Sequence, residues 1–229
     1  MARTAATDID TGTGPAEPAG GTGTEGGGES LPPTAARAVR RSLAARRSTY
    51  VDEVQRLLDA GLALMVESDD PPRVADIVRR SGLSNQAFYR HFASKDELIV
   101  AVVEAGSGRL ETYLEHQVAL APTPEAKLRA WVVGVLSQAN PHVATPTRAV
   151  MGNFRQLPPS HRTSTGRPGG PLLVAILERL GSPDPERDAT AVQTLAFGRL
   201  DQFVWDTPPT PEDIEQLVAF CLAAVGRPA

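Results

Sequence analysis

The sequence predicts an all-α protein with an N-terminal helix-turn-helix domain, a long connecting helix and a larger helical C-terminal domain. Apolar residues recur at three- and four-residue steps along most of the chain, and no stretch alternates apolar and polar residues for long enough to be a strand. Clusters of Pro and Gly separate these apolar stretches. Residues 73–92 have the layout of two short helices joined by a tight turn, which is that of a helix-turn-helix.

Composition limits the class of protein. The chain has 229 residues, of which 41% are hydrophobic, and this is enough to bury a core. Its single cysteine, Cys221, excludes an internal disulfide, and no run of about 18 apolar residues could cross a bilayer. The N-terminus has no apolar segment of the kind found in export signals. We therefore expect a cytoplasmic protein with no membrane partner.

Charge is distributed unevenly along the chain, although the formal net charge is only -4. Residues 1–33 hold one arginine against five acids and consist mostly of Gly, Thr, Ala and Pro, so we expect a disordered, low-complexity tail. Residues 34–47 contain five arginines and no acid, and their composition predicts a basic helical arm. Such an arm is either a solvated helix face or a segment that contacts DNA.

The first helix of the predicted helix-turn-helix domain, which we place at residues 48–98, runs to about Glu67. Its apolar residues keep a helical spacing from Val51 to Met65, and Thr49 provides a start signal. Two acids and two prolines at 69–72 end this helix.

Two short helices and a long one follow. Gly82 closes the first of them, because glycine suits the left-handed position after a helix end, and Ser84 caps the second. Ser94 and Glu97 form a capping box in which Glu97 reaches back to the amide of Ser94. The long fourth helix begins there and continues to about Val118.

The C-terminal domain, residues 99–229, contains the rest of this long helix and five further apolar stretches that we interpret as helices. These stretches cover residues 125–139, 142–157, 170–181, 186–205 and 211–225. A segment rich in Pro, Ser, Thr and Gly separates the second from the third, and we expect a loop there.

One face of the predicted recognition helix carries side chains that suit DNA. If Phe88 and Phe92 point inwards, a helical wheel turns the opposite face outwards. The residues on and beside that face are Gln86, Ala87, Tyr89 and Arg90. Gln and Arg can form paired hydrogen bonds with adenine and guanine, and Ala can touch a thymine methyl group. Phosphate contacts are expected from Ser84 at the helix N-terminus and from Tyr89, His91 and Lys95.

These residues resemble a known family. The sequence FYRHF at 88–92, followed by SKDEL at 94–98, is similar to the DNA-binding signature of the TetR family of bacterial transcriptional regulators. The resemblance covers about residues 48–104, and beyond them only the predicted architecture agrees. It implies a homodimer that binds a palindromic operator in double-stranded DNA, usually represses, and releases DNA when a small-molecule effector enters the C-terminal domain.

The resemblance also implies roles for single residues. It assigns base contacts to Asn85, Gln86, Ala87 and Arg90. It assigns contacts with the DNA backbone to Thr49, Tyr50, Arg73, Tyr89, His91 and Lys95. The chain departs from the family pattern in its long N-terminal extension, in the acids and prolines at 69–72 and in Phe88, where Leu is frequent. No cofactor is expected, and no metal site, because His116, His142 and His161 have no His, Cys or Asp partner at ligand spacing.

In the C-terminal domain the resemblance places an effector pocket among the helices after the connector. The expected lining residues are Trp131, Met151, Asn153, Phe154 and Phe197. The last two predicted helices are apolar on more than one face, so they need a second surface to cover them, which favours a dimer interface. The expected interface residues are Leu195, Leu200, Phe203, Val218, Cys221 and Leu222.

We conclude from the sequence that the chain is a ligand-responsive, dimeric transcriptional repressor and not an enzyme. An activator, or a regulator without an effector, would carry the same features. A helical enzyme or protein-interaction module could use the same architecture, because a fold does not determine function. The outward side chains of residues 84–92 favour DNA binding over these two classes.

Overall fold

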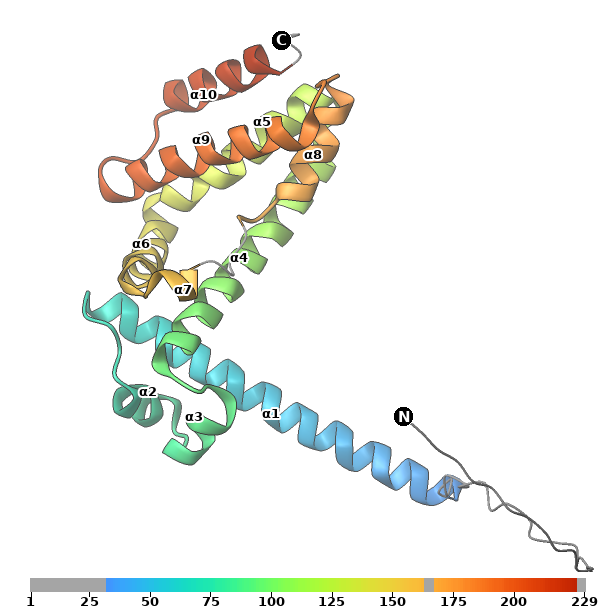
Figure 1. Cartoon of the computed structure of the whole chain (residues 1–229), viewed down its shortest axis with the longest axis vertical. Coiled ribbons are helices and arrows are strands. Elements are labelled where there is room, and N and C mark those ends of the chain that lie inside the picture. Colours follow the sequence, from blue (N-terminus) through green and yellow to red (C-terminus); the bar gives the residue numbers. More distant parts are fainter. Residues whose placement is uncertain (1–31, 163–166, 226–229) are drawn as a thin grey trace, which may run out of the picture. The chain divides into compact units, whose positions relative to one another are not determined.

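The computed structural model describes residues 32–162 and 167–225, which form helices joined by short connections (Figure 1). This described part contains no strand, and it confirms the predicted all-α fold class. The helices are α1 (Pro33–Glu67), α2 (Val74–Ser81), α3 (Asn85–His91), α4 (Lys95–Leu120), α5 (Pro124–Leu136), the 3-10 turn η1 (Ser137–Ala139), α6 (Pro141–Gln156), α7 (Pro159–Arg162), α8 (Gly170–Arg179), α9 (Pro185–Trp205) and α10 (Pro211–Ala224). The expected disordered tail, apart from its last two positions, lies outside the described residues.

α1 runs without a break from Pro33 to Glu67, so the predicted helix start at Thr49 is wrong. Residues 34–47 are rich in Ala, Arg and Leu, whose high helix propensity lets the helix continue through that position. The predicted basic arm is therefore the N-terminal part of α1. By its contacts the chain divides within this helix into two units, one up to Ala45 and one from Arg46.

One apolar core joins the C-terminal half of α1 to α2, α3 and the start of α4. Its most deeply buried side chains include Leu57, Ile77, Phe88 and Leu98, each with none of its surface exposed. Gly61 lets α1 and α4 approach closely, because a Cβ atom there would lie 2.7 Å from Leu98 Cδ2. This core fixes the position of the second short helix, α3, on the outside of the domain.

The turns around α3 are formed largely as the sequence predicts. Gly82 adopts the left-handed conformation with φ of 65° after α2, and the Ser84 hydroxyl accepts a hydrogen bond from the amide of Ala87 at 3.1 Å. At α4, the Ser94 hydroxyl accepts from the amide of Glu97 at 3.1 Å. The Glu97 carboxylate accepts from the amide of Ala93 at 2.6 Å, one residue before the predicted amide of Ser94.

The second core belongs to the C-terminal domain and is centred on α5. α5 packs against α4, α8, α9 and α10, and its Trp131 is completely buried. The indole nitrogen of Trp131 donates to the carbonyl of Gly169 at 3.1 Å. Burial raises the pKa of the Cys221 thiol, on α10, to about 11. Cys221 is a buried member of this core, so α10 packs the side that carries it inwards.

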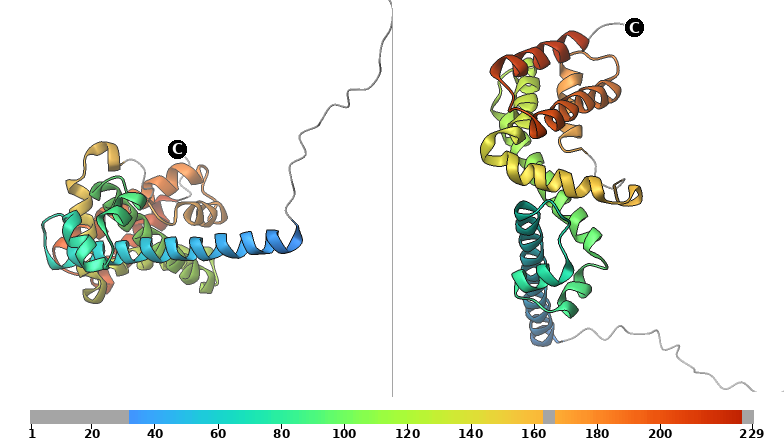
Figure 2. Two further views of the ribbon diagram at one scale, coloured as in Figure 1. Left: turned by 90° about the horizontal axis from the view of Figure 1, so that it is seen from below. Right: turned by 90° about the vertical axis from the view of Figure 1, so that its left-hand side faces the viewer.

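α6, drawn in yellow in Figure 2, contributes side chains to both cores. Phe154 and Leu157 pack with the N-terminal core, whereas Met151 packs against the C-terminal one. The guanidinium of Arg148 donates from Nε and Nη2 to the carbonyl of Val204 in α9, at 3.0 and 2.7 Å. α6 is therefore a mechanical link between the helix-turn-helix domain and α9.

The predicted boundaries of the C-terminal helices agree with the structure within about two residues if η1 is counted with α5. The expected loop between α6 and α8 contains one additional turn of helix, α7, which a sequence rich in Pro and Ser did not predict. No helix in the described part of the chain is long and apolar enough to cross a membrane.

Candidate nucleic-acid interface

α3 divides its side chains between the core and the outer surface. Phe88 is completely buried, and Phe92, just after the helix, is 6% exposed. Asn85, Gln86 and Arg90 are exposed, and the Tyr89 side chain is 59% exposed. The helical wheel therefore assigns the inward and outward faces correctly at these positions.

Ala87 differs from the wheel, which places it beside the outward face. Only 6% of its surface is exposed, and it lies on the buried side of α3 next to Phe88. α3 has only seven residues, so its buried and exposed faces meet close to Ala87, which directly precedes the buried Phe88. The methyl group of alanine also reaches little beyond the backbone. Its predicted contact with a thymine methyl group has correspondingly little surface available.

Arg90 and His91 both bind a carboxylate of α1. Glu53 Oε2 accepts from Arg90 Nη2 at 2.7 Å and lies 2.6 Å from His91 Nε2. The side chain of Glu53 is 16% exposed and that of His91 is 9% exposed, while Arg90 remains 44% exposed. Two neighbouring side chains of α3, Arg90 and His91, thus contact the same carboxylate oxygen of Glu53, and Arg90 still reaches the surface.

Tyr50 completes this arrangement from the preceding turn of α1. Its ring lies edge-on to the ring of His91, with centroids 5.6 Å apart, and the guanidinium carbon of Arg90 lies 5.5 Å from the Tyr50 ring centroid. The hydrogen bond with His91 and, to a smaller extent, the hydrogen bond with Arg90 lower the pKa of Glu53 below its usual value. Glu53 is consequently a carboxylate at neutral pH. We call Tyr50, Glu53, Arg90 and His91 the α1–α3 cluster.

The other predicted backbone contacts lie near helix N-termini. Arg73 occupies the position before α2, Lys95 is the first residue of α4, and both are exposed. Thr49 is exposed on α1, and Ser84 caps α3. The structure gathers Tyr50, Arg90 and His91 into one cluster, whereas Arg73 and Lys95 mark separate ends of other helices.

Sequence reasoning missed Glu53. One feature of the sequence could have indicated Glu53: it lies in the amphipathic helix one turn before the buried Leu57, on the side that carries the core residues. An acid at such a position requires a partner, because burying an unpaired charge is costly. The partner itself comes from α3, 37 residues further along the chain, and local patterns do not show it.

A cavity of about 390 Å³ lies among α1, α4, α6 and α9, within the size range of small-molecule sites. Of the residues predicted to line an effector pocket, Met151 and Phe197 line this cavity. Trp131, Asn153 and Phe154 do not line this cavity: Trp131 is buried in the core around α5, and Phe154 packs with the N-terminal core. Arg109 is the one charged residue among those that line the cavity in the described part of the chain.

Asn153 is buried on α6 for another reason. Its side-chain nitrogen donates to the carbonyl of Ala149 at 3.0 Å, so the side chain folds back on its own helix. Its Oδ1 atom is buried without a hydrogen-bond partner among the described residues.

The predicted dimer residues are mostly interior to the single chain. Leu200, Phe203, Val218 and Cys221 belong to the C-terminal core and are at most 9% exposed, while Leu195 and Leu222 are partly buried against that core. In the single chain the first four therefore offer little surface to a second copy. Much of the apolar surface of these helices is covered within the same chain, because α5 and α8 pack against α9 and α5 packs against α10.

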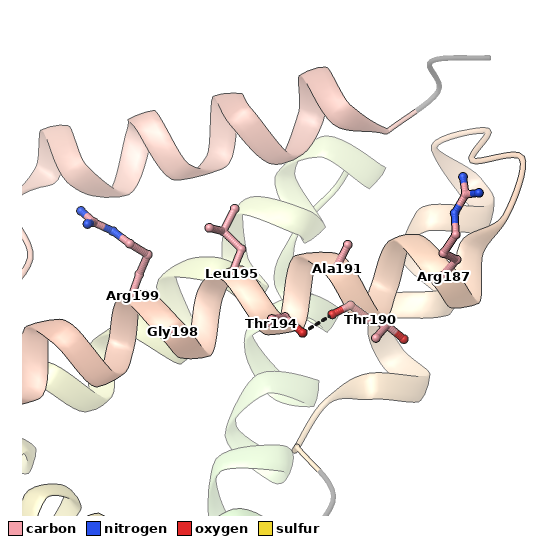
Figure 3. Close-up of a pocket in the computed structure, with 7 residues that line it drawn as sticks. All are labelled: Arg187, Thr190, Ala191, Thr194, Leu195, Gly198 and Arg199. Atoms are coloured by element: carbon pink, nitrogen blue, oxygen red, sulfur yellow. Dashed lines mark hydrogen bonds between the residues drawn. The ribbon is translucent and has the colours of Figure 1, made fainter. Parts of the chain in front are cut away.

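A different face of α9 remains exposed. A shallow, mainly apolar surface runs along it, and Figure 3 shows the side chains that form it. We call this surface the α9 strip; its residues are Arg187, Thr190, Ala191, Thr194, Leu195, Gly198 and Arg199. Arg187 lies 3.7 Å from Asp184 and Asp188, and Arg199 lies 3.5 Å from Asp213, so the charges at its two ends are paired within the chain.

Comparisons with known proteins agree with this geometry. Residues 57–102 match the family model of the bacterial regulatory proteins of the tetR family. A 51-residue segment is 41% identical to an uncharacterized HTH-type transcriptional regulator, YwcC, from Bacillus subtilis (strain 168). That match spans 22% of this chain and 23% of the curated relative.

Solved structures resemble the chain over a larger part of its length. A putative TetR-family regulator from Mesorhizobium loti is 16% identical with a TM-score of 0.59, covering 77% of this chain and 96% of that one. The reduced form of NemR from E. coli is 18% identical with a TM-score of 0.58, covering 77% and 100%. FadR from Bacillus subtilis, in complex with stearoyl-CoA, is 20% identical with a TM-score of 0.55, covering 75% and 96%. At these identities the likeness shows a shared fold.

Proposed function

We propose that this chain, which belongs to the tetR family of bacterial regulatory proteins through its N-terminal domain, binds an operator as a homodimer and represses transcription until a small molecule releases it. The chain is a DNA-binding transcriptional regulator; we propose the symmetry of its operator, its response to an effector and the direction of its regulation. The observation that carries it is the outer face of α3, where Gln86, Tyr89 and Arg90 are exposed over a buried Phe88. The proposed regulator works in the cytoplasm by binding alone, without catalysis.

In this proposal α3 enters the major groove. Gln86 reads adenine and Arg90 reads guanine through paired hydrogen bonds, and Asn85 contacts a base at the start of the helix. Exposed Tyr89, Arg73 and Lys95 bind phosphates, which position the protein without reading sequence. His91 is different, because its side chain is 9% exposed and held by Glu53, so its proposed phosphate contact is secondary to its place in the α1–α3 cluster.

We further propose that two copies pair through the α9 strip. If the two α9 helices cross antiparallel between Thr194 and Leu195, Ala191 of each copy faces Gly198 of the other, and these small residues allow a close approach. The end charges already have partners in their own chain, so pairing leaves no new charge unpaired. A twofold dimer presents its two α3 helices to two half-sites and requires a pseudo-palindromic operator.

The cavity beside α6 is the proposed effector site. Its lining is mostly apolar and includes Leu110, Met151 and Phe197. A molecule bound there touches α4 and α6 together, and these helices connect to the recognition helix through the N-terminal core. Such a molecule shifts the spacing of the two recognition helices if it binds one arrangement of α4 and α6 better than another.

The experiment is a selection of fragmented genomic DNA by the purified full chain at several salt concentrations. The wild type is expected to enrich a pseudo-palindrome, and the double variant Gln86→Ala, Arg90→Ala is expected to lose that enrichment while retaining salt-dependent binding to any DNA. The matched control replaces exposed residues of the same types elsewhere, Arg179→Ala with Gln216→Ala, and retains the enrichment. Equal enrichment by both double variants, or no enrichment by the wild type, would contradict the proposal.

A further inference from the structure

The α1–α3 cluster places an acid against the proposed base reader. Arg90 has five N–H donors, of which the bond from Nη2 to Glu53 uses one, at 2.7 Å. The Arg90 side chain is 44% exposed and Glu53 only 16%. The carboxylate therefore lies behind the guanidinium, between α3 and α1, and leaves donors free for DNA.

Tyr50 and His91 hold this acid and this arginine in place. His91 Nε2 lies 2.6 Å from the same Oε2 atom that Arg90 binds, and the guanidinium carbon of Arg90 lies 5.5 Å from the centre of the Tyr50 ring. A long arginine side chain ordinarily loses considerable rotamer entropy when it docks on a base. Here a carboxylate and a ring from α1 impose one orientation before DNA arrives, which lowers that cost.

We propose that Glu53 is a specificity-determining positioning residue for DNA recognition, which orients Arg90 for one base and restrains it from neighbouring phosphates. This inference rests on the proposed function. A free arginine on a recognition helix can bind either a base edge or a phosphate oxygen, and only the first contact carries sequence information. A fixed negative charge beside the guanidinium also repels the DNA backbone, so it weakens nonspecific binding more than it weakens binding to the correct site.

Two substitutions separate the charge from the geometry. Glu53→Gln retains an acceptor oxygen but loses the charge, whereas Glu53→Asp retains the charge but shortens the side chain, so that one carboxylate no longer reaches both Arg90 and His91. Glu67→Gln is the matched control, because it removes another α1 carboxylate that pairs with an arginine, Arg80, at 2.6 Å. Thermal melting of each variant establishes that the fold is retained.

The measurement is the ratio of affinity for the selected operator to affinity for a scrambled duplex, together with the base preference at each operator position. Glu53→Gln is expected to lower the ratio about ten-fold, and to bind the scrambled duplex more tightly with a steeper salt dependence. Glu53→Asp is expected to lower the ratio with little change in scrambled binding. In both variants the loss of preference is confined to the base pair that Arg90→Ala also affects, and Glu67→Gln keeps the wild-type ratio.

A double-mutant cycle tests whether the effect passes through Arg90. With Arg90→Ala already present, Glu53→Gln is expected to cause no further loss of base preference. An equal loss in that background, a loss spread over all positions, or an unchanged ratio in both Glu53 variants would overturn the inference while leaving the regulator intact. A wild type that selects no sequence would instead overturn the proposed function and this inference together.

Discussion

At the scale of single residues, the most consequential finding is that a predicted DNA-contacting side chain already has partners in the free protein. The helical wheel correctly predicts that Gln86 and Arg90 are exposed, because the helical period and two buried phenylalanines determine the inward face of α3. It cannot show that Arg90 binds Glu53, because that contact joins residues far apart in sequence. Local periodicity predicts which face a residue occupies, and only tertiary structure shows what it touches there.

Glycine at 169 is fixed by two separate requirements, and a pair of variants separates them. Gly169 has φ of 77°, and a Cβ atom there would lie 2.6 Å from the indole nitrogen of Trp131. Gly181 has φ of 79°, but a Cβ atom there would meet open space. Gly181→Ala should therefore lower the free energy of unfolding by about 1 kcal/mol, from backbone strain alone.

Gly169→Ala adds the clash to the strain, and we expect it to cost about 3 kcal/mol. Urea denaturation of the full chain followed by tryptophan fluorescence measures both variants. Because Trp131 donates to the carbonyl of Gly169, the native emission of Gly169→Ala should also shift, whereas that of Gly181→Ala should not. Equal costs for the two substitutions would show that the Trp131 contact is relaxed in solution.

At the scale of helices, the sequence predicts most boundaries because their end signals are local. Ser84, Gly82 and Ser94 occupy the capping positions expected of them. Thr49 has an equally good start signal, but it lies inside α1, since the preceding residues favour helix and leave no orphan amide to cap. A capping residue therefore marks a helix start only where the chain before it cannot continue the helix.

The helices around the cavity also make the chemistry of the effector testable. Arg109 lines the cavity and makes no hydrogen bond or ion pair among the described residues, so we expect an apolar molecule with an anionic group to bind better than its neutral analogue. The probes are 1-anilinonaphthalene-8-sulfonate and N-phenyl-1-naphthylamine, which share an apolar body and differ in the sulfonate. Arg109→Gln should weaken binding of the sulfonate about five-fold and leave the neutral probe unchanged.

Arg179→Gln is the control for that titration, because it removes an exposed arginine of α8 that does not line the cavity. Displacement of either probe by a candidate effector, measured by fluorescence, then reports occupation of the cavity. If Arg109→Gln and Arg179→Gln alter sulfonate binding equally, the probe binds outside the cavity.

At the scale of the whole molecule, the sequence could not distinguish burial within one chain from burial between two. α9 and α10 are apolar on more than one side. α5 and α8 pack against α9, which carries Leu200, and α5 packs against α10, which carries Val218. The surface that we propose for a partner is the α9 strip, whose small residues give almost no hydrophobic signal. Residue type indicates that a surface is buried, but topology decides by which chain.

The α9 strip therefore predicts the oligomeric state. The wild type should sediment as a dimer, with twice the 24.3 kDa mass of the single chain. Ala191→Glu introduces a charge where two copies are proposed to meet, and burying it unpaired should weaken dimerisation by about 3–5 kcal/mol, or at least a hundred-fold. Because Ala191 is exposed in the single chain, this variant should fold as a monomer.

Ala75→Glu, at an exposed position of α2, is the control for a charge added to a helix and should remain dimeric. Sedimentation velocity at micromolar concentration distinguishes the two variants. A dimeric Ala191→Glu protein would place the interface elsewhere.

Sharing of α6 between the two cores also restricts how such a regulator can be recombined. Phe154 and Leu157 complete the N-terminal core although they follow α5 in sequence. A chimaera joined after α4, with a foreign sensing domain, would lose both side chains and leave the helix-turn-helix core open on one side. A functional sensing domain must therefore carry, at the end of its own α6, side chains that fill the places of Phe154 and Leu157. The interchangeable unit of this protein is thus defined by a packing surface and not by a single position in the sequence.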